Sequence, residues 1–297
     1  MTMKQKRVAI GVDVGGTKIG TGIVDGEGRV YASPRTIATC ANEPGEVIMA
    51  NLLSLLKETL TDVADSNVQG IGIGCTGPLD TKRGLILDVE NLPTLNYYPL
   101  KETVERELSL PVVVENDANA MILGEAVWGA GKGARSVLGF TLGTGIGCAL
   151  VNEGKIWRGH ADCAGEIWTS PYKESILENY VSGNAVTRLY KEYAQEEWPA
   201  HHIAELARNG DEVALRVWDV FAEALAYALS WTVNTIDPEL IVMGGSVLKS
   251  ADLYWNKVNH LFRQYICQSA SENMTLHPAM LGDNAGFIGA AALILKQ

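Results

Sequence analysis

The feature that most constrains the fold is a hairpin with a glycine turn that occurs twice in the chain. Residues 7–31 read as a strand, a glycine turn, a second strand over 19–24, a polar turn and a third strand. Residues 136–157 repeat this pattern, with GFTLG in the place of GVDVG. Glycine supplies the positive φ angles that tight turns need. A repeat spaced by about 128 residues is too long for a solenoid, so two similar halves are expected.

The first glycine turn also carries groups that suit a bound phosphate. Gly15, Gly16, Thr17 and Lys18 follow Asp13, an acid between two valines at the mouth of the turn, where packing gives no reason for a charge. Uncovered backbone N–H groups can hold phosphate oxygens, and a carboxylate can hold magnesium or its waters. A plain hairpin is the alternative interpretation. The spacing fits neither a P-loop nor the dinucleotide fingerprint GxGxxG.

Two further strands are expected to end in residues that face a ligand. The strand over 69–74 runs into a loop with Gly77, and the strand over 112–114 runs into Asn116 and Asp117. Ligands of α/β sheets lie beyond the carboxyl ends of the strands. A simple turn at Gly77 and helix capping by Asn116 or Asp117 are the alternatives. However, the ENDAN stretch holds four polar side chains within five positions, and one cap needs only one of them.

Helices and strands alternate along the rest of the chain, which favours an α/β fold. Apolar spacing predicts helices over residues 44–63, 100–108, 121–127, 176–181, 212–235, 253–265 and 284–295. Shorter apolar runs predict strands over 85–88, 239–243 and 274–279, and the second of these ends in Gly244 and Gly245.

Composition limits the classes of function. The 297 residues, with a mass of 32.0 kDa, suffice for two domains of ordinary size. A net charge of -11 argues against a nucleic-acid surface. Apolar runs stay below the roughly 18 residues that a membrane-crossing helix needs, so a cytoplasmic protein without membrane contact is expected. The five cysteines show no CxxC or CxC spacing, which favours neither a disulfide framework nor a cysteine zinc site.

The repeated hairpin, the ENDANA stretch, GTGIG and the late GG together resemble the ROK family of sugar kinases and sugar-responsive repressors. The resemblance covers the chain from Val8 to the final predicted helix. It implies an actin/hexokinase-like ATPase fold, which is an α/β architecture of two ribonuclease-H-like domains around a cleft. The domains would comprise residues 1–115 together with about 283–297, and residues 116–282.

By this resemblance the protein is an ATP-dependent kinase that phosphorylates a hexose, glucose first, at the 6-hydroxyl, with Asp117 as the catalytic base. The sugar would be bound by Gly77, Asn91, Asn116, Asp117, Glu166 and Glu178. ATP would be bound by Asp13, Gly15, Gly16, Thr17, Lys18, Gly143, Thr144, Gly145, Gly244 and Gly245. Asp13 would position Mg²⁺ through water, and the working form would be a homodimer.

The chain departs from the family pattern directly after the AGE motif that ends at Glu166. The family's Gly-His pair and CxCGxxGCxE zinc cluster are replaced by Trp168-Thr169 and a shorter segment, so no zinc is expected. His160 is too isolated to supply the missing ligands and is interpreted as structural. Trp168 either stacks on a pyranose ring or fills the space that the zinc loop would occupy.

Alternatives remain open for the substrate and for the class of protein. Another sugar (N-acetylmannosamine or a further amino or N-acetyl hexosamine, fructose, mannose, a β-glucoside) or polyphosphate as donor would keep the enzyme class. A sugar-sensing regulator that does not bind DNA is the alternative class. Family repressors carry a helix-turn-helix segment before the first hairpin, whereas six residues precede Arg7 here. A non-catalytic sugar-binding protein would be expected to lose Asp13 or Asp117, so an enzyme is favoured.

Overall fold

The computed structural model describes residues 6–63 and 67–296, which fold into two compact units. The first unit comprises Met1–Gly133, Val151–Ala164 and Ala279–Gln297, and the second comprises Ala134–Leu150 and Gly165–Pro278. The compact units assign residues 116–133 to the first unit, whereas the sequence prediction assigned them to the second domain. The division into functional domains stays a prediction, and its outer ends at residues 1 and 297 lie outside the described residues.

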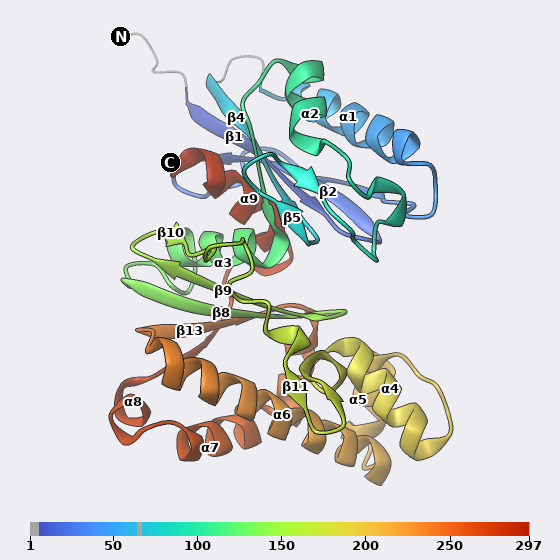
Figure 1. The fold of residues 1–297 in the computed structure, drawn as a ribbon, viewed down its shortest axis with the longest axis vertical. Helices are drawn as coiled ribbons and strands as arrows, with labels where there is room; N and C mark the ends of the chain where they lie inside the picture. Colours follow the sequence, from blue (N-terminus) through green and yellow to red (C-terminus); the bar gives the residue numbers. More distant parts are fainter. Residues whose placement is uncertain (1–5, 64–66, 297) are drawn as a thin grey trace. The chain divides into compact units, whose positions relative to one another are not determined.

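A five-stranded sheet with the order β3-β2-β1-β4-β7 forms the centre of the first unit (Figure 1). β1 pairs antiparallel with β2 and parallel with β4, while β4 pairs parallel with β7 and β2 pairs antiparallel with β3. The strands are β1 Arg7–Val14, β2 Lys18–Asp25, β3 Arg35–Ala38, β4 Asn67–Cys75 and β7 Val112–Asn116. The parallel strands β1, β4 and β7 therefore end at the same edge of the sheet.

A second five-stranded sheet has the order β10-β9-β8-β13-β14. β13 pairs parallel with both β8 and β14, and β10 pairs antiparallel with β9. The strands are β8 Ser136–Leu142, β9 Ile146–Asn152, β10 Lys155–Ile156, β13 Leu240–Gly244 and β14 Leu276–Pro278. Each sheet thus has a glycine-turn hairpin extended by an antiparallel strand on one side and by two parallel strands on the other. At the level of strand order, the predicted internal repeat is confirmed.

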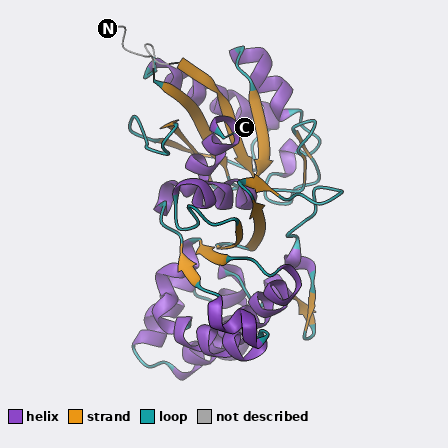
Figure 2. Cartoon of the chain, turned by 90° about the vertical axis from the view of Figure 1, so that its left-hand side faces the viewer, coloured by secondary structure: helices purple, strands orange, loops and turns teal. Residues whose placement is uncertain are grey.

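Four helices of the first unit cover the two faces of its sheet (Figures 1 and 2). They are α1 Gly45–Thr61, α2 Leu100–Leu108, α3 Asp117–Trp128 and α9 Ala285–Leu295. Because side chains alternate along a strand, Val8 and Ile10 pack in the core that α1 covers, whereas Ala9 packs with α9. A Cβ at Gly11 would lie 1.7 Å from the carbonyl oxygen of Phe287, so glycine at this position permits the close approach of α9 to β1.

The helices of the second unit pack together beside its strands (Figure 2). They are α4 Gly183–Ala194, α5 Ala200–Arg208, α6 Glu212–Ile236, α7 Trp255–Tyr265 and α8 Gln268–Asn273. The long helix α6 buries Trp218 and Phe221 against Tyr254, and the stacked rings of Trp218 and Tyr254 have centroids 5.6 Å apart. Within the described ranges, none of the helices has the length and apolar character required to cross a membrane.

Some sequence predictions of local structure were wrong. Residues 176–181 do not form a helix; β12 pairs there with β11, and a 3₁₀ turn follows. The third strand predicted before residue 31 is reduced to one bridge between Val24 and Val30. Of the strand predicted over 85–88, only the first two residues are in a strand, β6. The helices α4, α5 and α8 were not predicted. The shorter elements are β5 Leu79–Asp80, β6 Leu85–Ile86, β11 Pro171–Tyr172, β12 Ser175–Ile176 and 3₁₀ segments at Pro93–Leu95, Ile167–Thr169, Leu177–Asn179, Ser246–Leu253 and Gly282–Asn284.

Candidate active site

The carboxyl ends of β1, β4 and β7 bring three site residues to one edge of the first sheet. Asp13 lies opposite Gly74 in the register of β1 and β4, and Cys75 lies opposite Asn116 in the register of β4 and β7. Asp117 follows Asn116 directly as the first residue of α3. Side chains at the ends of neighbouring parallel strands share one edge of the sheet. Asp13, Asn116 and Asp117 therefore lie at the same edge of the sheet.

Asp13 lies where negative charge is disfavoured. Burial, and then the nearby charge of Asp117, raise the pKa of the Asp13 carboxyl from 3.8 to about 6, although Lys18 opposes them. Burial also raises the pKa of the Cys75 thiol far above its ordinary value, and the charges of Asp117 and Asp13 add to this. Two carboxylates that repel each other in a poorly solvated place are stabilised by a cation.

The first turn of α9 lies against Asp13. A Cβ at Gly286 would lie 2.3 Å from Oδ2 of Asp13, so a side chain there would displace the Asp13 carboxylate. The absence of a side chain at Gly286 thus brings the helix backbone directly beside the carboxylate. Sequence reasoning missed Gly286, because it lies in a helix at the other end of the described chain and has no motif of its own.

The glycine turn between β1 and β2 contacts Asn91. The Gly15 N–H donates to the Lys18 carbonyl oxygen at 3.0 Å, which closes the turn. A Cβ at Gly16 would lie 3.1 Å from the carbonyl oxygen and 3.2 Å from the Cβ of Asn91. Thr17 and Lys18 are exposed. The structure thus brings the turn expected to bind phosphate together with a residue expected to bind sugar.

Asn116 caps α3. Its side-chain oxygen accepts hydrogen bonds from the N–H groups of Ala118 at 3.0 Å and Asn119 at 3.2 Å. Oδ1 of Asp117 also accepts from the Ala118 N–H, at 2.8 Å, which orients that carboxylate. The side-chain nitrogen of Asn116 lies beside Gly77, where a Cβ would be 3.2 Å from it. Capping, the alternative that the sequence left open, is confirmed for Asn116, and the same side chain contacts Gly77.

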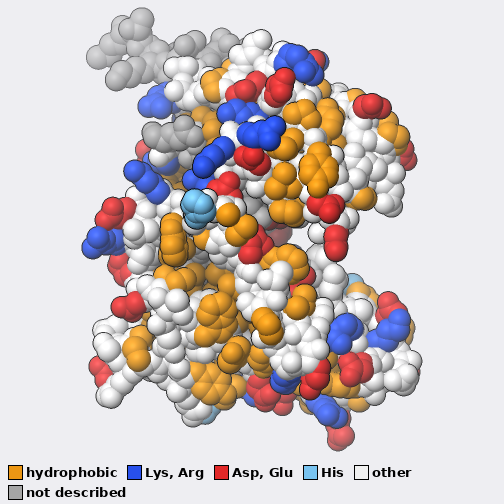
Figure 3. Space-filling view, viewed as in Figure 1, with side chains coloured by type: hydrophobic (Ala, Val, Ile, Leu, Met, Phe, Trp, Pro, Cys, Tyr) orange, Lys and Arg blue, Asp and Glu red, His pale blue; other side chains and the backbone are white. Residues whose placement is uncertain are grey.

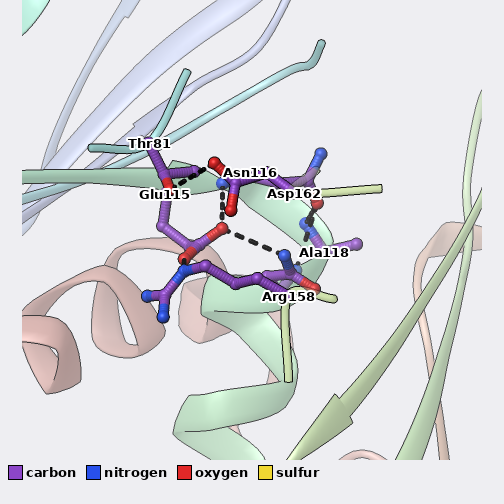
Figure 4. Close-up of polar contacts among 7 residues, drawn as sticks. Thr81, Glu115, Asn116, Ala118, Arg158 and Asp162 are labelled. Atoms are coloured by element: carbon purple, nitrogen blue, oxygen red, sulfur yellow. Dashed lines mark hydrogen bonds and ion pairs between the residues drawn. The ribbon is translucent and has the colours of Figure 1, made fainter. Parts of the chain in front are cut away.

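Glu115 is completely buried one residue before this cap and anchors it (Figure 4). Its carboxylate accepts from the Asn116 N–H at 2.9 Å, from the Asn119 side-chain amide at 3.0 Å and from Nε of Arg158 at 2.6 Å. A buried carboxylate needs such donors, because an unpaired charge away from water is costly. The network fixes the backbone that carries Asp117.

A second interaction holds the segment after β10 within the first unit. The Thr81 hydroxyl donates to the Asp162 carboxylate at 2.9 Å, and the Ala164 N–H donates to the Arg158 carbonyl oxygen at 3.1 Å. Sequence reasoning missed these residues. Arg158 lies 43 residues from Glu115, and Asp162 lies 81 residues from Thr81, so spacing along the chain gave no signal.

The glycine turn of the second unit is held by Glu178 and by the start of α4. The Gly143 N–H donates to the Gly145 carbonyl oxygen at 3.0 Å, and the Gly183 N–H donates to the Gly143 carbonyl oxygen at 2.7 Å. Oε2 of Glu178 accepts from the Ile146 N–H at 3.0 Å, and a Cβ at Gly145 would lie 2.2 Å from the same atom. The Thr144 carbonyl oxygen accepts from Asn184 at 3.3 Å. Glu178 thus lies in contact with the turn.

Gly244 ends β13, and Gly245 follows it beside the same turn. Gly244 is paired with Thr141 of β8, and Gly245 has a φ of 96°, which favours glycine. A Cβ at Gly245 would lie 2.2 Å from the carbonyl oxygen of Leu142, the residue that precedes Gly143. The two glycine turns of the second unit therefore share one end of its sheet.

Glu166 interacts with Trp168, the residue at which the chain leaves its family pattern. The Trp168 indole N–H donates to the Glu166 carboxylate, and the Trp168 ring packs against the core of the second unit. Burial and the charge of Glu166 together raise the pKa of the Cys148 thiol to about 12. Glu166 and Thr169 are exposed, and the Thr169 hydroxyl donates to the Glu166 carbonyl oxygen at 3.4 Å. The Trp168 side chain thus packs against the core of the second unit and donates a hydrogen bond to Glu166.

The acidic pair at the first sheet edge suits a magnesium ion that arrives with a nucleotide. Across residues 6–63 and 67–296, no group of three or more His, Cys, Asp or Glu side chains is arranged to hold a metal ion. Asp13 and Asp117 supply two carboxylates, and Mg²⁺ is commonly held by one or two carboxylates, with waters and substrate phosphates as the other ligands. His160 is exposed.

Comparison with known proteins identifies the family of this chain. The model of the ROK family matches residues 9–297. A glucokinase from Halalkalibacterium halodurans is 31% identical over 315 residues, which cover 97% of this chain and 95% of that protein. The crystal structure of a ROK hexokinase from Thermus thermophilus has a TM-score of 0.87 and 31% identity, with 97% of each chain covered. A ROK family glucokinase from Streptomyces griseus in complex with glucose and AMPPNP has a TM-score of 0.81 and 31% identity, with 98% of this chain and 100% of that chain covered. With this α/β fold of the actin/hexokinase-like ATPases, the chain belongs to the ROK family.

Proposed function

We propose that Asp117 of this ATP-dependent hexose kinase removes the proton from the 6-hydroxyl of a glucose-like sugar as that hydroxyl attacks the γ-phosphoryl group of ATP. The observation that carries the proposal is the sheet edge of the first unit, where Asp117 begins α3 close enough to Asp13 to shift its pKa. Similarity to a glucokinase, and to a glucokinase structure with glucose and AMPPNP, supports the sugar and ATP as substrates.

Asp117 is suited to act as a general base. Phosphoryl transfer depends mainly on positioning and on neutralising charge, and a carboxylate near the attacking hydroxyl contributes roughly 10²–10⁴-fold. The hydrogen bond from Ala118 orients the Asp117 carboxylate, and Glu115 and Arg158 hold the backbone before it. These hydrogen bonds thus fix both the direction of the Asp117 carboxylate and the backbone that carries it.

Asp13 would hold Mg²⁺ through water. When bound, the ion neutralises the charge that develops on the β- and γ-phosphates. The raised pKa of Asp13 supports this role, because a cation relieves the cost of ionising a poorly solvated carboxylate beside Asp117. Asp13 would thereby place the ion, and the phosphates bound to it, near Asp117.

Backbone amides of the glycine turns would bind the nucleotide, because N–H groups in such turns form concave sites for anions. In the first unit the phosphates would contact Gly15, Gly16, Thr17 and Lys18. In the second unit the phosphates would contact Gly143, Thr144 and Gly145, and the adenosine would lie beside Gly244 and Gly245. The Glu178 carboxylate packed against Gly145, and the Leu142 backbone packed against Gly245, support turns that are fixed before the ligand binds.

Hydroxyl groups of the sugar would be bound by Gly77, Asn91, Asn116, Asp117, Glu166 and Glu178. A site built to hydrogen-bond a hydroxyl discriminates against sugars that lack it. Because the Trp168 N–H donates to Glu166, we assign Trp168 the orientation of that carboxylate instead of stacking on the sugar ring. Without the zinc cluster of its relatives, the protein would shape this part of the pocket with Trp168 and Thr169.

A coupled assay of ADP release over a panel of sugars tests the function. With ATP and Mg²⁺, glucose should give a higher kcat/KM than mannose, fructose, N-acetylmannosamine, N-acetylglucosamine or a β-glucoside, and polyphosphate should be the poorer donor. Asp117→Asn should lower kcat by roughly 10²–10⁴-fold. Asp252→Asn, which removes a surface ion pair with Arg208, should not change kcat. Wild-type turnover by Asp117→Asn would refute the assigned base.

The protein is further proposed to act in the cytoplasm as a homodimer without a nucleic-acid partner. The net charge of -11 supports the last point, and Figure 3 shows Lys and Arg side chains mixed with Asp and Glu on the face drawn. An aromatic groove of about 540 Å³ in the second unit is the surface to test for pairing, and it includes Tyr172, Tyr227, Trp231 and Tyr265. Light scattering should give a dimer mass for the wild type and a monomer mass for Tyr265→Glu. A monomer mass for the wild type would refute pairing.

A further inference from the structure

Thr39 is a buried residue that holds the first glycine turn by two hydrogen bonds. It directly follows β3 and is completely buried. Its hydroxyl donates to the Gly15 carbonyl oxygen at 2.6 Å, and its backbone N–H donates to the Thr17 carbonyl oxygen at 3.0 Å. One residue thus binds two carbonyl groups of the turn, from the side where β3 lies.

These two bonds set the direction of two peptide N–H groups. The peptide bonds that follow Gly15 and Thr17 are trans. In a planar trans peptide the carbonyl group and the next N–H point in opposite directions. Because the carbonyl groups of Gly15 and Thr17 point to Thr39, the N–H groups of Gly16 and Lys18 point away from Thr39.

The turn would not hold this arrangement by itself. Gly15 and Gly16 impose little restriction on the backbone, so the peptide between them can rotate at small cost. The Gly15 N–H is occupied by the Lys18 carbonyl oxygen, which closes the turn but does not fix the direction of the Gly15 carbonyl group. The hydrogen bond donated by the Thr39 hydroxyl fixes the direction of the Gly15 carbonyl group.

We propose that Thr39 is a positioning residue for ATP, which orients the N–H groups of Gly16 and Lys18 toward the phosphates. This inference rests on the proposed function of the turn. It assigns the hydroxyl of a residue outside every glycine motif a role in nucleotide affinity. A threonine at this place acts through the peptides of the turn and does not touch the reacting atoms.

The test compares Thr39→Val, which removes the hydroxyl at nearly constant shape, with Thr39→Ser, which keeps it. Thr59→Val is the matched control, because Thr59 is buried in the same unit and its hydroxyl also donates to a backbone carbonyl, that of Leu55 at 2.8 Å. Mg²⁺·AMPPNP binding by calorimetry, KM for ATP, KM for glucose and urea unfolding are measured for each variant.

Thr39→Val should weaken Mg²⁺·AMPPNP binding and raise KM for ATP by roughly tenfold, the order expected when oriented hydrogen bonds to a charged phosphate are lost. KM for glucose should not change. Thr39→Ser should recover wild-type nucleotide binding. Thr59→Val also removes a hydrogen bond to the buried Thr21 hydroxyl at 2.9 Å, so it should lower stability at least as much as Thr39→Val. It should not change nucleotide binding, which separates orientation of the turn from loss of a buried hydroxyl.

Nucleotide binding by Thr39→Val equal to that of the wild type would overturn the inference. So would an equal loss of nucleotide binding in Thr39→Val and Thr59→Val. Wild-type protein that binds Mg²⁺·AMPPNP but releases no ADP with any sugar would refute the proposed kinase function, while the binding measurements would still decide the role of Thr39.

Discussion

Replacing Arg158 with methionine should lower the free energy of unfolding and kcat together. Glu115 has an exposed fraction of 0%, and its three donors include Arg158 at 2.6 Å. Breaking a buried ion pair from one side costs roughly 3–5 kcal/mol. Arg158 is 37% exposed, and the Asn116 and Asn119 donors remain, so we expect a loss of about 2–3 kcal/mol. Since Glu115 supports the backbone before Asp117, kcat should fall by roughly tenfold, with little change in KM for ATP.

Urea unfolding measures the stability effect, with unchanged m values as the sign that the variants unfold in the same way. Arg35→Met is the control, because the pair of Arg35 with Asp62 is accessible to solvent and its loss should change stability little. In a background of Glu115→Gln the buried charge is gone, so Arg158→Met should cost much less than in the wild type. A loss of stability in Arg158→Met no greater than that in Arg35→Met would contradict this role of Arg158, as would an equal effect of Arg158→Met in the wild type and in the Glu115→Gln background.

Three further substitutions test other parts of the site. The folded-state pKa of Asp13, about 6 against an ordinary 3.8, means that the metal-free folded protein holds a proton that the unfolded chain releases, so the free energy of unfolding should fall as pH rises from about 4 to about 6. Asp13→Asn should remove this fall in urea titrations at several pH values, and an unchanged slope would contradict the assignment. Gly286→Ala places a Cβ 2.3 Å from Oδ2 of Asp13 and should lower both the melting temperature and kcat, whereas Gly26→Ala, with open space around it, should change neither in thermal scans and ADP assays. Trp168→Phe keeps an aromatic ring but removes the donor to Glu166, so KM for the sugar should rise by roughly fivefold; an unchanged KM would exclude the orienting role.

The sequence predicted the parts of the site that depend on short, local patterns. The alternation of apolar residues before and after a glycine turn is a local signal, and it identified both hairpins. The rule that ligands of α/β sheets lie beyond the carboxyl ends of the strands identified Gly77, Asn116 and Asp117 as candidates, and the structure places Asp13 at the same edge. The capping of α3 by Asn116 was foreseen as an alternative, and in the structure this side chain both caps the helix and contacts Gly77.

Other parts depend on contacts between distant segments and could not be predicted. The bond between Arg158 and Glu115, and the approach of Gly286 to Asp13, leave no pattern in the residues around them. The helix expected over 176–181 was wrong because Leu177, Tyr180 and Val181 are buried by the core of the second unit while the backbone forms a 3₁₀ turn. Apolar residues at these positions are expected both for an amphipathic helix and for a buried irregular segment. Packing against the core of the second unit favours the 3₁₀ turn over the helix.

The packing of α9 on the first sheet has a consequence for the order in which the protein can be made. The backbone of α9 lies directly on Gly11 of β1 and Gly72 of β4, where a Cβ at Gly72 would be 1.8 Å from the Ala290 carbonyl oxygen. The ribosome synthesises β1 and β4 long before α9. During translation, the glycine-lined face of these strands that α9 covers is therefore exposed. The first unit, whose synthesis begins first, is therefore completed last, and a nascent chain must keep this face from packing against other apolar surfaces until α9 is made.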